Sequence, residues 1–329
     1  MGDRRHRKSV MLTMTHACNL TCRYCYEANK DSARMTVSEA ERVIAKHFST
    51  SDGFDEIEFH FHGGEPFLEF DAIRDVCEWV WSQSWPKPFI FFATTNGTLI
   101  HGRIQEWVEA NKQRFYLALS LDGTKAMHDL NRSKSYDKID VGFFVRNWPD
   151  QPVKMTVSDL TLNRLAEGVI ELHRKGFLIQ CNLAQGIDWS LAEHLSVLGD
   201  ELDKLIAFYL TNPEVAPCDF LTMHLASVGA SSKSGRELSG VGDSEPRKWC
   251  GIATDLVAAD VDGLEYPCHL FLPVAAGEKS RVFEQVDFTD CRTLTDPRCK
   301  ECVLLPVCPT CYGMNLLRTG DASRRDDSL

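Results

Sequence analysis

Between about residues 8 and 211 the sequence alternates six times between a short β-like run and an amphipathic helical stretch. A strand–helix series of this kind favours a parallel sheet with helical crossovers. The first expected helix opens at Thr36, where "TVSE" has the pattern of a capping box ending at Glu39. The strands are expected at 9–15, 56–64, 89–97, 115–123, 153–158 and 177–184, and the helices from 36 and near 70–84, 99–111, 138–148, 161–175 and 190–211.

Chemically distinctive residues come directly after the expected strands. A cysteine-rich loop follows the first strand, "GGEP" (63–66) the second, "TNG" (95–97) the third and "SLDG" (120–123) the fourth. In barrels built from β/α units, functional groups gather at the C-terminal ends of the strands. The sequence therefore predicts a functional site at that end of an α/β barrel.

The composition limits the classes of partner. The chain has 329 residues, of which 43% are hydrophobic, enough for one large domain or two medium ones. Its net charge of −11 argues against nucleic acid or an anionic membrane as the main partner. No run approaches the roughly 18 apolar residues that span a bilayer, and the N-terminus has no hydrophobic signal core. We therefore expect a cytoplasmic protein with no nucleic-acid or membrane partner.

The thirteen cysteines are unevenly distributed. Three lie within residues 18–25 and seven between 250 and 311, whereas Cys77, Cys181 and Cys218 are scattered. In a reducing compartment, clustered cysteines are more often metal ligands than disulfides. The Gly- and Ser-rich stretch 227–248 has the composition of a linker or mobile loop. The expected organisation is an extension (1–7), a barrel (8–211), a linker (212–248), a cysteine-rich domain (249–318) and a disordered tail (319–329).

The first cysteine cluster lies in "THACNLTCRYCYE" (15–27), with three residues between Cys18 and Cys22 and two between Cys22 and Cys25. Three thiolates on one loop can bind three corners of a cubane iron–sulfur cluster. A closed zinc site needs a fourth ligand, which the neighbouring His16 could supply. Uncoordinated core cysteines are a further alternative. The spacing alone leaves these three interpretations open.

The motif "CNLTCRYC" resembles the cysteine motif of radical S-adenosylmethionine (SAM) enzymes. "GGEP" resembles the motif whose backbone and glutamate receive the methionine amino group of SAM, and "SLDG…HD..R" the pattern in which a serine meets the ribose and an arginine the carboxylate. The resemblance implies a [4Fe–4S] cluster on Cys18, Cys22 and Cys25, and an enzyme that cleaves SAM to a 5′-deoxyadenosyl radical. The SAM-binding residues that it implies are Tyr24, Gly63, Gly64, Glu65, Asn96, Ser120, Asp122 and Arg132.

The second cysteine cluster comprises Cys250 and Cys268 around Gly263, followed by "CKECVLLPVCPTC" (299–311). The last four of its cysteines would also suit a zinc module. The whole pattern resembles the SPASM and twitch extensions of radical SAM enzymes, which hold auxiliary clusters. The resemblance implies an inner cluster on Cys250, Cys268 and Cys311, and an outer one on Cys299, Cys302 and Cys308.

Two departures from that pattern leave the number of auxiliary clusters open. Only Pro309 and Thr310 separate the last two cysteines, where the family more often has three residues. No cysteine follows Cys311, so an outer cluster would need an open or non-cysteine ligand, or Cys291 folding back. The expected fold is a partial (β/α)6 TIM-like barrel followed by a small SPASM/twitch-like domain.

We expect a maturase that installs a thioether or carbon–carbon crosslink in a ribosomally made precursor peptide. The alternatives are an anaerobic sulfatase-maturing enzyme that forms formylglycine, a peptide epimerase returning a hydrogen atom from Cys181 or Cys218, and a non-enzymatic zinc-binding module. The expected partners are the peptide or protein substrate and a one-electron reductant such as flavodoxin or ferredoxin. About eight residues precede the first expected strand, so leader recognition falls to the barrel rim, the 227–248 loop or a separate protein.

Overall fold

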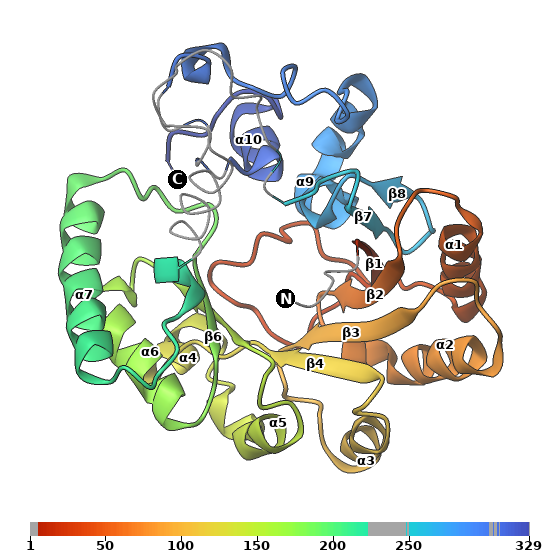
Figure 1. Ribbon diagram of the computed structural model, residues 1–329, viewed down its shortest axis with the longest axis horizontal. Coiled ribbons are helices and arrows are strands. Elements are labelled where there is room, and N and C mark those ends of the chain that lie inside the picture. The colour runs from red at the N-terminus through yellow and green to blue at the C-terminus, as the bar shows by residue number, and fades with distance from the viewer. Residues whose placement is uncertain are drawn as a thin grey trace.

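The computed structural model describes residues 6–222, 248, 250–302, 305, 308 and 310–328 (Figure 1). The expected extension (1–7) therefore falls largely outside the described residues, as does the greater part of the expected linker (212–248). The cysteines of both clusters are among the described residues.

Strands alternate with helices along residues 7–211, as expected. Parallel pairing joins β1 to β2, β2 to β3, β3 to β4, and β5 to β6, and a parallel bridge from Ser120 to Lys154 joins the last two strands to the end of β4. This confirms the partial (β/α)6 barrel. The strands are β1 (Arg7–Thr15), β2 (Glu56–Gly63), β3 (Phe89–Thr95), β4 (Phe115–Leu119), β5 (Val153–Val157) and β6 (Ile179–Leu183).

Helices lie outside the strands (Figure 1). They are α1 (Val37–Ser49), α2 (Phe70–Ser82), α3 (Gly102–Ala110), α4 (Lys125–Asn131), α5 (Val141–Asn147), α6 (Leu165–Arg174) and α7 (Ala192–Thr211). The start of α1 follows the sequence signal, because the Thr36 side chain accepts the backbone N–H of Glu39. Helix α4 is not among the helices expected from the sequence.

The main core lies between strands and helices. Phe59, Phe61, Phe91 and Phe115 are fully buried there, and Phe61 stacks against Phe91 with ring centroids 5.4 Å apart. Because successive strand residues point to opposite faces, the alternate positions of β2 face the inside of the barrel. Those positions are polar: Glu58, His60 and His62.

The cysteine-rich region continues the barrel sheet rather than starting a separate one. Strand β7 (Leu256–Ala259) pairs in parallel with β1, and β8 (Glu265–Tyr266) pairs antiparallel with β7. The sheet order is β4-β3-β2-β1-β7-β8. Helices α9 (Pro273–Ala276) and α10 (Tyr312–Thr319) follow in the blue part of Figure 1.

The expectation that residues 319–329 form a disordered tail is not met by residues 319–328. Ala322 is fully buried, and the Asp326 N–H donates to Asn315 Oδ1 at 2.9 Å. The Trp189 N–H donates to the Ser328 carbonyl at 2.8 Å, so the segment also contacts the barrel. Its polar sequence suggested disorder, but its backbone groups find partners within the fold.

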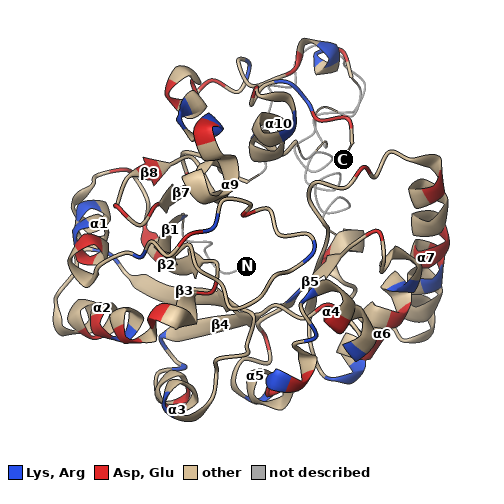
Figure 2. Cartoon of the chain, turned by 180° about the vertical axis from the view of Figure 1, so that it is seen from behind, with Lys and Arg blue, Asp and Glu red and all other residues tan. Residues whose placement is uncertain are grey.

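Charges of both signs are spread over the outer helices, as Figure 2 shows for α5, α6 and α7. Within the described ranges, no helix combines the length and the apolar composition that crossing a membrane requires.

Candidate active site

The three cysteines of the first cluster lie on the loop between β1 and α1 and line a central cavity of about 770 Å³. This volume lies within the roughly 300–1,000 Å³ typical of small-molecule sites. Seven of the eight residues expected to bind SAM line the same cavity: Tyr24, Gly63, Gly64, Glu65, Asn96, Ser120 and Arg132. The structure thus brings together residues that the sequence placed after four different strands.

The two glycines of "GGEP" allow the end of β2 to pack against the backbone of the cysteine loop. A Cβ added to Gly64 would lie 2.3 Å from the Ala17 carbonyl oxygen and 2.9 Å from Cys18 Cβ, and one on Gly63 would lie 2.3 Å from the Thr15 carbonyl oxygen. The Gly64 N–H donates to Thr15 O, and the Glu65 N–H to Ala17 O, both at 3.0 Å. The glycines therefore fix the position of the cysteine loop relative to the strand.

Glu65 is a buried carboxylate held by three donors from the protein. Its oxygens accept hydrogen bonds from Thr95 Oγ1 at 2.8 Å, from the Asn96 N–H at 2.8 Å and from the Phe67 N–H at 3.2 Å. Burial nevertheless raises the pKa of Glu65 to about 7. A bound ammonium group would offset that burial, which fits the role that the motif implies.

Asp122 does not line the cavity, contrary to the expectation that it binds SAM. Its side chain is fully buried and accepts hydrogen bonds from Tyr24 Oη (2.5 Å), Arg132 Nε (3.0 Å), Asn131 Nδ2 (3.2 Å) and the Thr156 N–H (3.0 Å). Asp122 therefore positions Tyr24 and Arg132, which do line the cavity. The Arg132 guanidinium carbon lies 5.4 Å from the Tyr24 ring centroid.

The first cysteine cluster fits a metal cluster by its chemistry. Burial raises the pKa of the Cys18 thiol to about 11 and also raises that of Cys22, so both hold protons at neutral pH unless a metal replaces them. Cations stand beside the sulfurs: Lys30 Nζ lies 3.1 Å from Cys25 Sγ, and Arg132 acts electrostatically on Cys22. Buried thiols with adjacent cations suit thiolate ligands of a metal cluster.

His16 does not complete a zinc site in this arrangement. Its Nε2 lies 2.7 Å from Asp260 Oδ1, and its Nδ1 lies 2.9 Å from Asp31 Oδ1. With both ring nitrogens engaged by carboxylates, neither is available as a ligand. Among the described residues, no three His, Cys, Asp or Glu side chains are grouped to hold a single metal ion.

One cysteine of each expected C-terminal set reaches the central cavity. Cys311 lines it together with Cys308, and the cavity therefore joins both cysteine clusters. Burial raises the pKa of the Cys268 thiol, and Cys311 and Cys250 add to that effect. This mutual influence shows that Cys250, Cys268 and Cys311 are near one another, although Cys250 is exposed.

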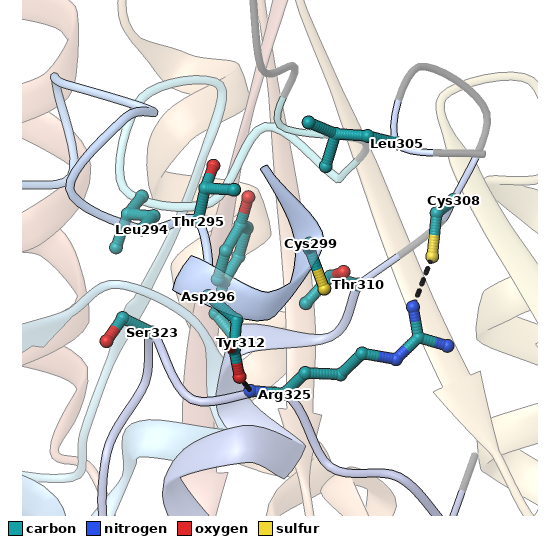
Figure 3. Close-up of a pocket in the computed structure, with 10 residues that line it drawn as sticks. All are labelled: Leu294, Thr295, Asp296, Cys299, Leu305, Cys308, Thr310, Tyr312, Ser323 and Arg325. Atoms are coloured by element: carbon teal, nitrogen blue, oxygen red, sulfur yellow. Dashed lines mark hydrogen bonds between the residues drawn. The ribbon is translucent and has the colours of Figure 1, made fainter. Parts of the chain in front are cut away.

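The outer set is accompanied by an arginine (Figure 3). Arg325 donates through Nη1 to Cys308 Sγ at 2.8 Å, and its backbone N–H donates to Asp296 Oδ2 at 2.9 Å. Cys299, Cys308 and Arg325 line one small cavity of about 20 Å³. Cys302, in contrast, is exposed. Arg325 thus contributes a positive charge beside the outer cysteines.

Comparison with known proteins identifies the barrel. Residues 12–140 match the Radical SAM superfamily. The chain contains a radical SAM domain. Over 327 aligned residues it is 24% identical to a cysteine-type anaerobic sulfatase-maturating enzyme of Clostridium novyi, covering 88% of this chain and 83% of that one. Of several other curated relatives it spans less than half, between 32% and 49% of each sequence.

Solved structures show the same fold over almost the whole enzyme. It superposes on native anSMEcpe with bound AdoMet with a TM-score of 0.73 at 18% identity, covering 97% of this chain and 94% of that chain. It superposes on Streptococcus suis SuiB bound to the precursor peptide SuiA with a TM-score of 0.61 at 17% identity, covering 98% and 75%. Its cofactors are SAM and a [4Fe–4S] cluster, and its cysteine-rich C-terminal region fits auxiliary clusters.

Sequence reasoning missed one group of cavity residues. His60, His62, Lys154 and His269 all line the central cavity but belong to no recognised motif. The signal was the polar alternation of "EIEFHFHGG" and "VKMTVS", which places the polar positions of each strand on one face. The sequence did not show that these two faces meet inside the barrel.

Proposed function

We propose that the enzyme is a maturase that modifies a peptide or a peptide segment of a protein. The observation that carries this proposal is the central cavity, which is lined by both cysteine clusters together with the motif residues. A cavity between two groups of cluster ligands provides a place where a substrate contacts the oxidising centre and a second electron carrier. The likeness to the sulfatase-maturating enzyme of Clostridium novyi supports the same class of substrate.

The proposed ligand assignment keeps the three cysteines of the first loop for the radical SAM cluster. When bound, the cluster and SAM supply the abstraction of a hydrogen atom from an unactivated carbon. Glu65 would receive the amino group of SAM, Arg132 its carboxylate and Ser120 its ribose. The Ser120 hydroxyl has no partner among the described side chains and lines the cavity, which supports this role.

We further propose that Cys250, Cys268 and Cys311 hold an inner auxiliary cluster and that Cys299, Cys302 and Cys308 hold an outer one. Cys291 is a candidate fourth ligand, because it acts electrostatically on Tyr312 together with Cys250 and Cys308. An external one-electron reductant, such as flavodoxin or ferredoxin, would reduce the clusters. The leader of a precursor peptide would bind at the barrel rim, at the 227–248 loop or on a separate protein.

Two types of modification share this site. One is an intramolecular crosslink, thioether or carbon–carbon, in a precursor peptide. The other is formylglycine formation from a Cys or Ser of a sulfatase, which the similarity to sulfatase-maturating enzymes over 83% of one relative supports equally. In both, the substrate loses a hydrogen atom to the SAM-derived radical and then gives up a further electron, for which an auxiliary cluster is the proposed acceptor.

The proposal is tested with the reconstituted enzyme, SAM, a reductant and candidate peptides from neighbouring genes. A crosslink removes two hydrogens and leaves no aldehyde, whereas formylglycine reacts with a hydrazide. Epimerisation leaves the mass unchanged and incorporates one solvent deuterium. Cys22→Ala should abolish 5′-deoxyadenosine formation, and Cys77→Ala, which changes a buried core thiol that is not part of the cavity lining, should retain it. Enzyme that forms 5′-deoxyadenosine yet modifies no peptide or sulfatase segment would contradict the proposal.

A further inference from the structure

The lining of the central cavity contains a lysine that the motifs do not explain. Lys154 lies on β5, where its carbonyl accepts the Leu121 N–H at 3.0 Å, and its side chain lines the cavity. Thr156, two positions later, lines the cavity as well, so this face of β5 points to the inside of the barrel.

The Lys154 ammonium has no hydrogen-bond or ion-pair partner in the part of the chain that the structure describes. Its nearest ring is Phe92, whose centroid lies 5.8 Å from Nζ, at the outer limit of a cation–π contact. The other cations on the cavity lining each have a partner: Lys30 contacts Cys25, Arg132 contacts Asp122, and Arg325 contacts Cys308. Lys154 is therefore the positive charge on the described lining that remains unmatched.

Two carboxylates influence Lys154 electrostatically without contacting it. Glu58 is engaged by Arg7 and Ser9, each at 3.3 Å. Asp219 accepts the Cys181 N–H at 2.7 Å. Burial lowers the pKa of Lys154 below its usual range, because the charged ammonium loses hydration inside the barrel.

The histidines that line the cavity add no charge. Burial lowers the pKa of His62 to about 3 and places that of His60 well below its ordinary value. His60 Nε2 lies 3.1 Å from Thr94 Oγ1 and His62 Nε2 lies 3.3 Å from Tyr26 Oη, so each imidazole is held by a neutral partner. An environment of neutral polar groups around one ammonium matches a ligand with one negative charge.

We propose that Lys154 binds a carboxylate of the substrate, and that the neutral histidines border this subsite. The inference rests on the proposed function in that the substrate is a peptide. It narrows that class to peptides that bring a carboxylate, from an Asp or Glu side chain or from the C-terminus, to the part of the cavity that Lys154 lines. The carboxylate would pair with the Lys154 ammonium and offset its burial.

Equilibrium binding without reductant tests the subsite separately from turnover. The holoenzyme, saturated with SAM so that Arg132 is occupied, is mixed with two pools of short synthetic peptides of neutral residues. In the first pool one position is Glu or Gln and every C-terminus is amidated. In the second pool no acidic residue is present, and the C-terminus is a free acid or an amide. Retained peptides are quantified by mass spectrometry.

The wild-type enzyme should retain the carboxylate member of at least one pool about tenfold over its neutral partner, and the pool that responds identifies the source of the carboxylate. Lys154→Met should bring that ratio close to one, Lys154→Arg should keep it above one, and Lys154→Glu should bring it below one. Iron content and SAM affinity must match wild type in the variants compared, and Lys154→Glu serves if Lys154→Met does not fold. A wild-type ratio near one, or a ratio unchanged in Lys154→Met, overturns the subsite.

These results separate the subsite from the proposed function. An enzyme that modifies peptides but shows no carboxylate preference loses the subsite and keeps its function. An enzyme that shows the Lys154-dependent preference but never alters a peptide loses the proposed function and keeps the subsite.

Discussion

His16 and Asp260 are 244 positions apart in the sequence, and their side chains meet with 2.7 Å between Nε2 and Oδ1. Both are buried, and Asp31 contacts the other ring nitrogen at 2.9 Å. The hydrogen bond to Asp260 raises the pKa of His16. The contact attaches the loop that bears Cys18 to the segment after β7.

Neutralising Asp260 should loosen that attachment. Asp260→Asn replaces a charge-assisted hydrogen bond by a neutral one, so we expect the free energy of unfolding to fall by about 1–3 kcal/mol. Asp262→Asn is the matched control, because Asp262 is exposed and uses Oδ1 to accept the Leu264 N–H, which an amide oxygen can also do. Denaturant unfolding measures the free energy of unfolding of both variants. Equal values for Asp260→Asn and Asp262→Asn would show that the His16–Asp260 contact contributes nothing to stability.

Asp122→Asn should weaken SAM binding although Asp122 does not line the cavity. The change leaves the buried Arg132 without its carboxylate, which should cost about 3 kcal/mol of stability. Because Tyr24 and Arg132 would lose their fixed positions, the Kd for SAM should rise about tenfold. Asp129→Asn breaks an ion pair with the exposed Lys125. It should leave the free energy of unfolding and the free energy of SAM binding within about 1 kcal/mol of wild type. Calorimetric titration with SAM checks this, and wild-type affinity in Asp122→Asn would argue against a positioning role.

Gly64→Ala should prevent the cysteine loop from seating against β2, because the new Cβ would meet the Ala17 carbonyl at 2.3 Å. We expect iron bound at the first cluster to fall severalfold, measured by iron analysis and by the spectrum of the reduced cluster. Gly199→Ala is the control: Gly199 lies within α7, where an added Cβ meets nothing within 4 Å. It should raise stability by about 1 kcal/mol through helix propensity. A wild-type iron content in Gly64→Ala would contradict the close packing of the cysteine loop against β2.

Glu265 links α1 to β8 and should make stability depend on pH. Burial alone would raise its pKa, but contacts with His47 (3.0 Å) and Lys46 (2.8 Å) outweigh burial and lower it to about 2. A lowered pKa means that the stabilisation is complete above the ordinary value of 4.5 and is lost as the pH falls from there towards 2.

Glu265→Gln should therefore cost about 2 kcal/mol at pH 7, after allowance for partial exposure, and much less at pH 3. The exposed Glu278→Gln should show no such difference. Urea unfolding at the two pH values makes the comparison. A Glu265→Gln penalty that stays constant between pH 7 and pH 3 would show that the interaction is not one of charge.

The sequence predicted the barrel closely because strand and helix have different apolar periods. The expected strand 153–158 is observed at Val153–Val157, and the expected helix 190–211 at Ala192–Thr211. Helix α4 was missed because its seven residues are too few to show a helical period. Strand β7 was missed because it has only four residues and its parallel partner, β1, lies at the other end of the sequence.

The motifs predicted which residues gather in the site but not what each one contacts. A carboxylate after a strand looks the same in sequence whether its donors come from a ligand or from the protein. Asp122 is saturated by protein donors, one of which, the Thr156 N–H, lies on another strand. Lys154 illustrates the converse, because only the folded barrel shows that its ammonium faces the cavity with no hydrogen-bond or ion-pair partner among the described residues.

The pairing of β7 with β1 also bears on how the protein is made. Strand β1 leaves the ribosome before the other strands of its sheet, and its partner on one side, β7, follows only after the six-strand series is complete. Until then one edge of a largely buried, apolar strand presents unpaired backbone groups, which are a template for association between nascent chains. Strand β7 therefore covers the free edge of β1 late in synthesis. The segment that protects this edge is also the one that contains the cysteines of the second cluster.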